Sequence, residues 1–406
     1  MAENSLVQRS DARRRPSLWL AASVVASGWA ALYSLVVWIL QFTVAPVHDD
    51  VRQYYVAAEA GLRYGWSSIY DQAILRELSS SFPQATRFIN DQTTFASTPF
   101  VAWVFAPLTV FPEPAAYVLW ALVSLVALVF ACWITVPYTG LARVALVLLA
   151  IGLWPVLLTL YFGQPTLVVI ALVAGAWRLA QHDRPLSSGA VLAIATALKP
   201  QVVILLPVAL LVSARYRVVG AWALGCALLG AIAFAALGAS GLAGWWHAVR
   251  GIQDLSINTT FTLAQPLGKG LLTYFLWGLQ GVVALAIAFR RRREIEVVFA
   301  EGILGTIATA TYLHNSDYCM LLVPAWLVLR TSPPLWHRWW LLTGVVPMQL
   351  LLTGLLAGPQ LLWDAAWLAI LAVTSFATRR STVESLPALH AKAVPAEVVM
   401  AARRTD

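Results

Sequence analysis

Apolar runs of about 20 residues recur along the chain from Leu18 to Ala377, and they restrict the possible folds more than any other feature. A run of this length is what an α-helix needs to cross the hydrocarbon core of a bilayer, which is about 30 Å thick. Hydrophobic residues make up 60% of the 406 residues and charged residues 11%, whereas soluble domains carry about 25% charged residues. The sequence therefore predicts an all-α polytopic membrane protein.

Basic residues account for the net charge of +8 and lie mainly at the ends of the apolar runs. Arginines cluster at residues 9–15, 290–293 and 379–380. Because cytoplasmic loops carry an excess of arginine and lysine, we expect both termini to lie in the cytoplasm. No basic stretch is long enough, or sufficiently interleaved with aromatic residues, to predict a nucleic-acid partner.

The basic clusters also predict the side of each loop, and they give about ten full spans plus three shorter elements. The shorter elements are residues 97–111, 187–198 and 201–213. The last two are separated by Lys199-Pro200, and we interpret them as half-helices that enter the membrane and return. Residues 97–111 carry two prolines and are expected to be re-entrant or interfacial. Broken helices persist at membrane depth where they line a cavity, so these elements predict an outward-facing site.

A single membrane domain is expected over residues 1–378, with an external loop at 46–95, and a cytoplasmic, disordered tail is expected at 379–406. Within the loop, Asp49 and Asp50 precede a set of residues with helical spacing. The apolar members are Val51, Tyr54, Tyr55, Ala58 and Leu62, and Arg52, Glu59 and Arg63 fall on another face. This pattern predicts an amphipathic helix on the membrane surface, and a second helix is expected at 71–80. Either aspartate could act as the helix N-cap.

Three further polar points fall on the predicted external side: Gln164 in "GQPT", Lys199 in "KPQ", and His314 with Asp317 in "LHNSD". Each has a structural alternative, namely a turn at residues 163–165, a lysine that snorkels to the interface, or a satisfied histidine. Ionisable groups within membrane segments are nevertheless functional candidates. A carboxylate can take a proton from an attacking hydroxyl, and cationic or amide donors can stabilise a departing phosphate. Group transfer from a phosphate-linked lipid would need this set, and so would an ion-coupled transporter.

The segment "DVRQYYVAAEAGLRYGWSSIYD" resembles the first external loop of the polyprenyl-phosphate-sugar-dependent glycosyltransferases of the GT-C class, family 87 in particular. The matching residues are Asp50, Tyr54, Tyr55, Ala57, Ala58, Gly65, Tyr70 and Asp71. Four later segments follow in the family's order: "TPFVAWVFAPLTVFP", "GQPTLVVIALVAGAW", "SSGAVLAIATALKPQVVILLPVALL" and "TYLHNSDYCMLLVPAWLVL". The resemblance covers residues 49–329. The sequence departs from the family at Ser97-Thr98, where relatives often carry an aromatic residue and a proline. It also departs in having two adjacent acids, Asp49 and Asp50.

The resemblance implies an inverting transfer of a sugar, mannose or arabinofuranose, from a polyprenyl-phosphate donor to a lipid-linked or cell-envelope glycan. The transfer would take place on the outer face of the cell inner (cytoplasmic) membrane. It implies that Asp50 is the general base, and that Asp49 could share or take over this role. The residues expected to bind substrate are Lys199, His314, Gln164, Tyr54 and Asp317. Members of the family generally need neither a nucleotide sugar nor a bound metal, so no cofactor is expected.

Two alternatives stay open at this point. The first is that Asp49 and Asp50 together hold a divalent ion. The cysteines predict no metal site of their own, because Cys132, Cys226 and Cys319 lie in apolar segments and share no metal-ligand spacing. The chain could also be a transporter or flippase of lipid-linked sugars that binds the same groups without catalysis. Transporters usually show paired, repeat-related broken helices, and no convincing internal repeat is visible in the sequence. The enzyme is therefore the favoured interpretation.

Overall fold

A computed structural model describes residues 17–80, 82, 95–253, 255–351 and 357–377. All regular secondary structure in these residues is helical, which confirms an all-α polytopic membrane protein. The arginines at residues 9–15 and the tail expected at 379–406 lie outside the described residues.

Within the described ranges, five helices are long and apolar enough to cross a membrane. They are α1 (Leu18–Val44), α5 (Glu113–Thr135), α11 (Tyr216–Gln253), α14 (Leu271–Arg290) and α19 (Ala357–Ala377). Helices α6 (Gly140–Ile151) and α7 (Trp154–Phe162) make a sixth span if the pair, bent by 56°, is counted as one. Continuous spans in the described residues are thus fewer than the ten expected, because several apolar runs fold as shorter helices.

The shorter helices include those expected from the sequence at residues 97–111 and 187–213. They are α4 (Pro99–Phe105), η2 (Ala106–Val110), α8 (Thr166–Gln181), α9 (Pro185–Leu198), η3 (Pro200–Val202), α10 (Leu205–Val212), α15 (Ile295–Ala308), η4 (Asn315–Leu321), α16 (Leu322–Arg330), α17 (Leu335–Thr343) and α18 (Val345–Gln349). The break between α9 and α10 falls at Lys199-Pro200, as predicted. Proline has no N–H to donate to the preceding turn, so the helix ends there.

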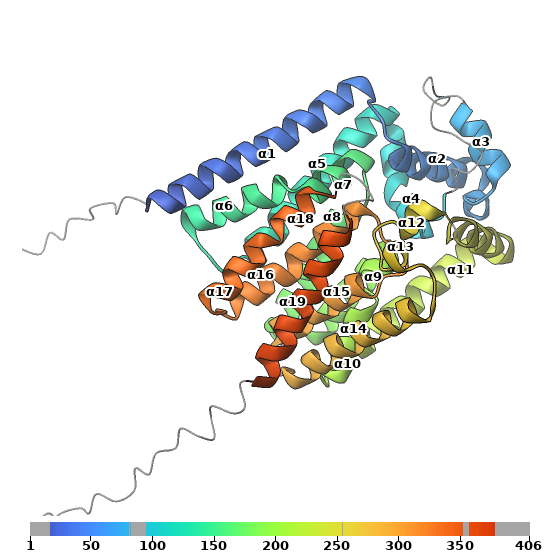
Figure 1. Ribbon diagram of the computed structural model, residues 1–406. Helices are drawn as coiled ribbons and strands as arrows, with labels where there is room; N and C mark the ends of the chain where they lie inside the picture. Colours follow the sequence, from blue (N-terminus) through green and yellow to red (C-terminus); the bar gives the residue numbers. More distant parts are fainter. Residues whose placement is uncertain (1–16, 81, 83–94, 254, 352–356, 378–406) are drawn as a thin grey trace, which may run out of the picture.

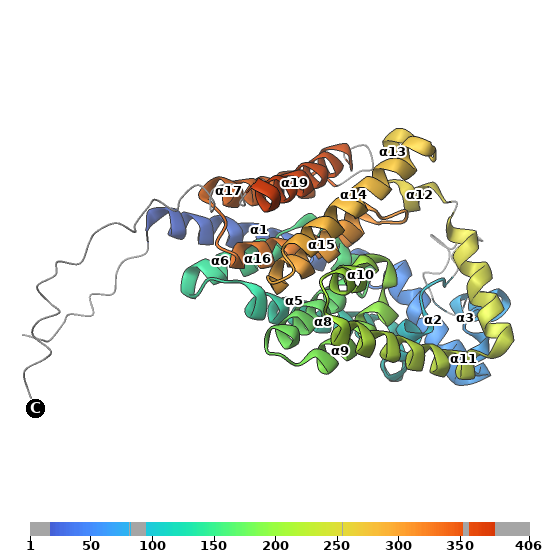
Figure 2. The ribbon, with the colours of Figure 1, turned by 90° about the horizontal axis from the view of Figure 1, so that it is seen from below.

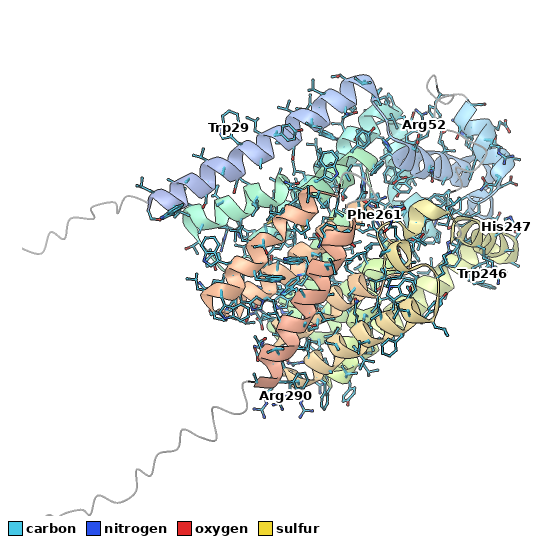
Figure 3. The ribbon with its side chains drawn as sticks, in the orientation of Figure 1. Trp29, Arg52, Trp246, His247, Phe261 and Arg290 are labelled. Carbon is cyan, nitrogen blue, oxygen red and sulfur yellow. The ribbon has the colours of Figure 1, made fainter. Side chains whose placement is uncertain are left out.

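Helices α8 and α15 form the centre of the molecule, and nearly every residue of α15 is buried. Figure 2 shows α17 and α19 along one face and α9 and α11 along the other, with α8, α15 and α16 between them. Helix α1 packs along α6 at the edge of the bundle (Figure 1). Its Trp29 is 67% exposed and points away from the bundle (Figure 3). An apolar outer face of this kind fits contact with lipid.

One end of the molecule is built by α2 (Asp49–Tyr64), η1 (Trp66–Ser68), α3 (Gln72–Ser80) and α4 (Figure 1). The second helix of the loop, expected at 71–80, is confirmed as α3, and Asp71 Oδ1 accepts from the Ala73 N–H at 2.9 Å. The expected helix is confirmed as α2, and its apolar members Val51, Tyr54, Tyr55 and Ala58 are buried. The expected division of faces is wrong for Arg52 and Leu62. Arg52 is buried against α5, where its Nε donates to Glu113 Oε1 at 2.7 Å, while Leu62 is 57% exposed.

Helix α11 bends at Gly238, whose φ of 63° interrupts the helix. Only glycine adopts this backbone conformation without strain. Beyond the bend, α11 packs against η1, so the chain reaches the same end of the molecule as α2. The short helices α12 (Ser256–Thr259) and α13 (Ala264–Leu267) follow and lead back to α14. This return path brings Asn258 to the loop before η4, where the Leu313 N–H donates to its carbonyl oxygen at 3.1 Å.

Candidate active site

The two adjacent aspartates lie in the first turn of α2 and contact different surroundings. The helix N-cap is His48, so the interpretation of either acid as the N-cap is wrong. Asp50 Oδ2 accepts a hydrogen bond from Gln164 Nε2 at 3.0 Å, the one hydrogen bond of this carboxylate within the described residues. Asp49 instead lines a small cavity with Arg52 and Phe95, and burial raises the pKa of its carboxyl.

Gln164 reaches Asp50 because α7 ends at Phe162, with Gly163 as its C-cap. The φ of Gly163 is 73°, and a Cβ atom here would lie 2.0 Å from Val51 Cγ2 of α2. The Gly163 carbonyl oxygen also accepts from Trp120 Nε1 at 2.7 Å. Glycine is therefore required twice, for the turn and for the close approach of α7 to α2. The structural and functional interpretations of "GQPT" therefore do not exclude each other, because the turn at Gly163 places the Gln164 amide beside Asp50.

The Gln164 side chain connects four other side chains. Its Oε1 accepts from Lys199 Nζ at 2.6 Å and from Ser316 Oγ at 2.9 Å. Its Nε2 lies 3.0 Å from Asp50 Oδ2 and 3.3 Å from His314 Nδ1. The amide thus uses both acceptor positions and both N–H groups, which fixes its orientation. Gln164 is 5% exposed, so these bonds are shielded from water.

Lys199, at the C-terminal end of α9, is 6% exposed and does not snorkel to an interface. Its ammonium donates to Gln164 Oε1, to Thr166 Oγ1 at 2.8 Å, and to Asp317 Oδ1 in a buried ion pair. An ammonium group has three N–H donors, and all three are used here. Asp317 is fully buried, and its Oδ2 accepts from the His314 backbone N–H at 3.1 Å. The ion pair therefore anchors the end of α9 to the start of η4.

His314 is held between Gln164 and Asn258. Its Nε2 lies 2.9 Å from Asn258 Oδ1, and the Asn258 amide nitrogen donates to the Ile252 carbonyl oxygen. The Asn258 oxygen must then accept from His314 Nε2–H, which leaves Nδ1 as the acceptor for the Gln164 amide. Burial lowers the pKa of the His314 imidazole, in keeping with this neutral tautomer.

Three residues of the network were not predicted from the sequence: Thr166, Ser316 and Asn258. The first two lie next to predicted residues, in "GQPT" and "HNSD". Asn258 is 56 or more residues away in the sequence from every other member of the network, so no local pattern signals it. Tyr54 lies one turn after Asp50 on α2 and is buried, with its ring 5.3 Å from that of Phe105. Burial raises the pKa of the Tyr54 hydroxyl well above its ordinary value.

No group of three or more His, Cys, Asp or Glu side chains within the described residues is arranged to hold a metal ion. The network carries two carboxylates and one ammonium, with the histidine neutral. Because Lys199 is paired with Asp317, the negative charge left over is that of Asp50. A lone carboxylate beside hydrogen-bond donors is suited to accept a proton from a bound hydroxyl.

The fold and this network define a class: a polytopic membrane protein with a buried, charged hydrogen-bond network at the ends of several helices. A model of glycosyltransferase family 87 matches residues 95–308, more than half of the chain. The chain belongs to glycosyltransferase family 87 and is a membrane glycosyltransferase. The match includes Gln164, Thr166, Lys199 and Asn258, while Asp50 and η4 lie outside it. No curated protein and no solved structure matches the chain.

Proposed function

We propose that the protein transfers a sugar from a polyprenyl-phosphate donor to a lipid-linked or cell-envelope glycan on the outer face of the cell inner membrane, with Asp50 as the general base. The observation that carries this proposal is the placement of the Asp50 carboxylate. One oxygen is held by Gln164, and the other has no hydrogen bond within the described residues. A base needs both properties, a fixed position and a free lone pair.

The proposed reaction is a direct displacement at the anomeric carbon. The acceptor hydroxyl oxygen forms a bond to that carbon as its proton passes to Asp50. The bond between the anomeric carbon and the phosphate oxygen breaks, and its electron pair leaves with the polyprenyl phosphate. The products are the glycosylated acceptor and polyprenyl phosphate, and Asp50 then releases its proton. The sugar would be mannose or arabinofuranose, on the strength of the resemblance to family 87.

The surroundings of Lys199 and Asp317 favour positioning roles over direct contact with the donor. All three N–H groups of Lys199 are used within the network, and Asp317 is fully buried. The pair holds Gln164 Oε1 and the His314 backbone, and through them the amide that orients Asp50. We therefore propose that the two residues act through Gln164 and His314, and that the acceptor and donor meet at the Asp50 side of the network.

A transport protein could use similar groups to bind the same lipid without breaking a bond. The two functions are separated by an assay in detergent, where no membrane divides the solution. Purified full-length protein is mixed with polyprenyl-phosphate mannose or arabinofuranose, radiolabelled in the sugar, and with a glycolipid acceptor from the envelope. We expect the label to move to the acceptor and polyprenyl phosphate to be released. Binding of donor without release, for both sugars and with acceptor present, would favour the transporter.

A further inference from the structure

A second polar cavity, of about 550 Å³, lies away from the network, where α14, α15, α16, α17 and α19 come together. Its lining includes Arg290, Arg291, Glu294, His337 and Ser375. Apolar side chains complete the wall: Val297, Val328 and Leu371. The cavity thus combines charged groups with an apolar surface, which is the composition that an amphiphile requires.

This cavity lies at the opposite end of the helices from Asp50. Glu294 directly precedes α15, whereas His314 follows its last turn. The 14 residues of α15 separate the two ends by about 21 Å. Figure 3 shows Arg290 at the far end of the molecule from Arg52, which neighbours Asp50 on α2. The cavity is therefore a separate site and not an extension of the network.

The charge of the cavity is positive. Arg291 is paired with Glu294, with its Nε 2.9 Å from Glu294 Oε1. Arg290 has no carboxylate partner within the described residues, and its guanidinium lies 5.9 Å from the centre of the Phe376 ring. Among the residues that the structure describes, one guanidinium beside the cavity thus has no carboxylate partner. Guanidinium groups bind phosphate oxygens with two parallel hydrogen bonds, which makes a phosphate group the natural complement.

Two buried polar atoms of the lining have no partner in the described part of the chain. His337 is 2% exposed and its Nε2 makes no hydrogen bond, and Ser375 is 4% exposed and its Oγ makes none. Buried polar groups without a partner are uncommon in folded proteins, because each loses its hydrogen bonds to water. The two residues come from α17 and α19, on walls different from that of Arg290. An anion inside the cavity would supply the missing partners.

From these observations we propose that the cavity is a phosphate-binding site at the end of the bundle opposite the network. Arg290 provides the charge, and the Ser375 hydroxyl and the Nε2–H group of the neutral His337 ring provide further hydrogen bonds. The phosphate is carried either by the headgroup of an anionic phospholipid or by free phosphate. Basic pockets between membrane helices are known to suit lipid headgroups, and the apolar part of the wall could cover the glycerol region.

The test measures binding to the full-length protein in detergent. Dioctanoyl-phosphatidylglycerol is titrated and counted by native mass spectrometry, and inorganic phosphate is titrated by calorimetry. We expect Arg290→Gln to weaken binding about tenfold and Ser375→Ala about threefold, as for the loss of a charge-assisted and a neutral hydrogen bond. The matched control is Arg292→Gln, because Arg292 is exposed, lies over the Phe289 ring and does not line the cavity.

The two probes identify the source of the phosphate. If only phosphatidylglycerol binds and shows this order of variants, the ligand is a lipid. If inorganic phosphate binds with the same order, the site takes free phosphate. The proposal is overturned if neither probe binds the unaltered protein, if Arg290→Gln and Ser375→Ala bind as well as it does, or if Arg292→Gln weakens binding as much as Arg290→Gln. Ser375→Ala removes only one oxygen atom and should fold normally. It therefore still tests the proposal if Arg290→Gln fails to fold.

Discussion

Asp50→Asn is expected to lower the transfer rate by about 10²- to 10⁴-fold, the range usual for loss of a general base. Asparagine has nearly the same shape, and its amide oxygen can still accept from Gln164 Nε2. What it cannot do is take a proton from the acceptor hydroxyl. The measurement is the rate of label transfer to the acceptor with saturating donor. The thermal unfolding temperature of the variant should stay close to that of the unaltered protein.

Asp49→Asn is the matched control, because it removes the same charge from the neighbouring residue. Asp49 lines the cavity with Arg52 and Phe95, and the Gln164 amide donates to Asp50 and not to Asp49. This variant should keep most of the activity. Full activity in Asp50→Asn would rule out Asp50 as the base. A large loss in Asp49→Asn, with Asp50→Asn active, would transfer the role to Asp49.

Lys199→Met is expected to destabilise the protein by about 3–5 kcal/mol, the usual cost of removing one partner of a buried ion pair. Asp317 is fully buried and would keep its charge without a counter-ion. The Gln164 oxygen and the Thr166 hydroxyl would each lose one hydrogen bond as well. The expected result is a marked fall in the thermal unfolding temperature in detergent.

The double variant Lys199→Met with Asp317→Leu separates charge from hydrogen bonding. Replacing both members of a buried pair with apolar residues is often neutral or stabilising, so part of the lost stability should return. Activity should not return, since Gln164 still lacks the Lys199 donor that fixes its amide. If Lys199→Met alone left the unfolding temperature unchanged, that result would contradict the buried ion pair between Lys199 and Asp317.

The all-helical membrane fold could be predicted because it depends on composition and on the length of apolar runs. The number of continuous spans could not, since prolines and short polar breaks divide runs that look uniform in hydropathy. The break at Lys199-Pro200 was visible because proline itself causes it. The burial of Arg52 was not, because helical spacing alone cannot reveal that Glu113 lies opposite on another helix.

The candidate site shows the same limit. The sequence singled out Asp50, Gln164, Lys199 and His314, and the structure brings all four into one network. The sequence could not show that Lys199 is buried and that all three of its N–H groups are used. That arrangement depends on three partners from other segments of the chain. Nor could it find Asn258, whose contact with His314 arises only from the return path after the bend in α11.

The anomeric configuration of the product tests the proposed mechanism most directly. Asp317 is buried in its ion pair and Asp49 faces another cavity, so Asp50 is the only carboxylate of the described network with an oxygen to spare. A retaining transfer by double displacement needs a carboxylate nucleophile in addition to an acid or base. We therefore predict that proton NMR of the glycosylated acceptor shows inversion relative to the donor. Retention of the donor's configuration would contradict Asp50 as the base of a single displacement.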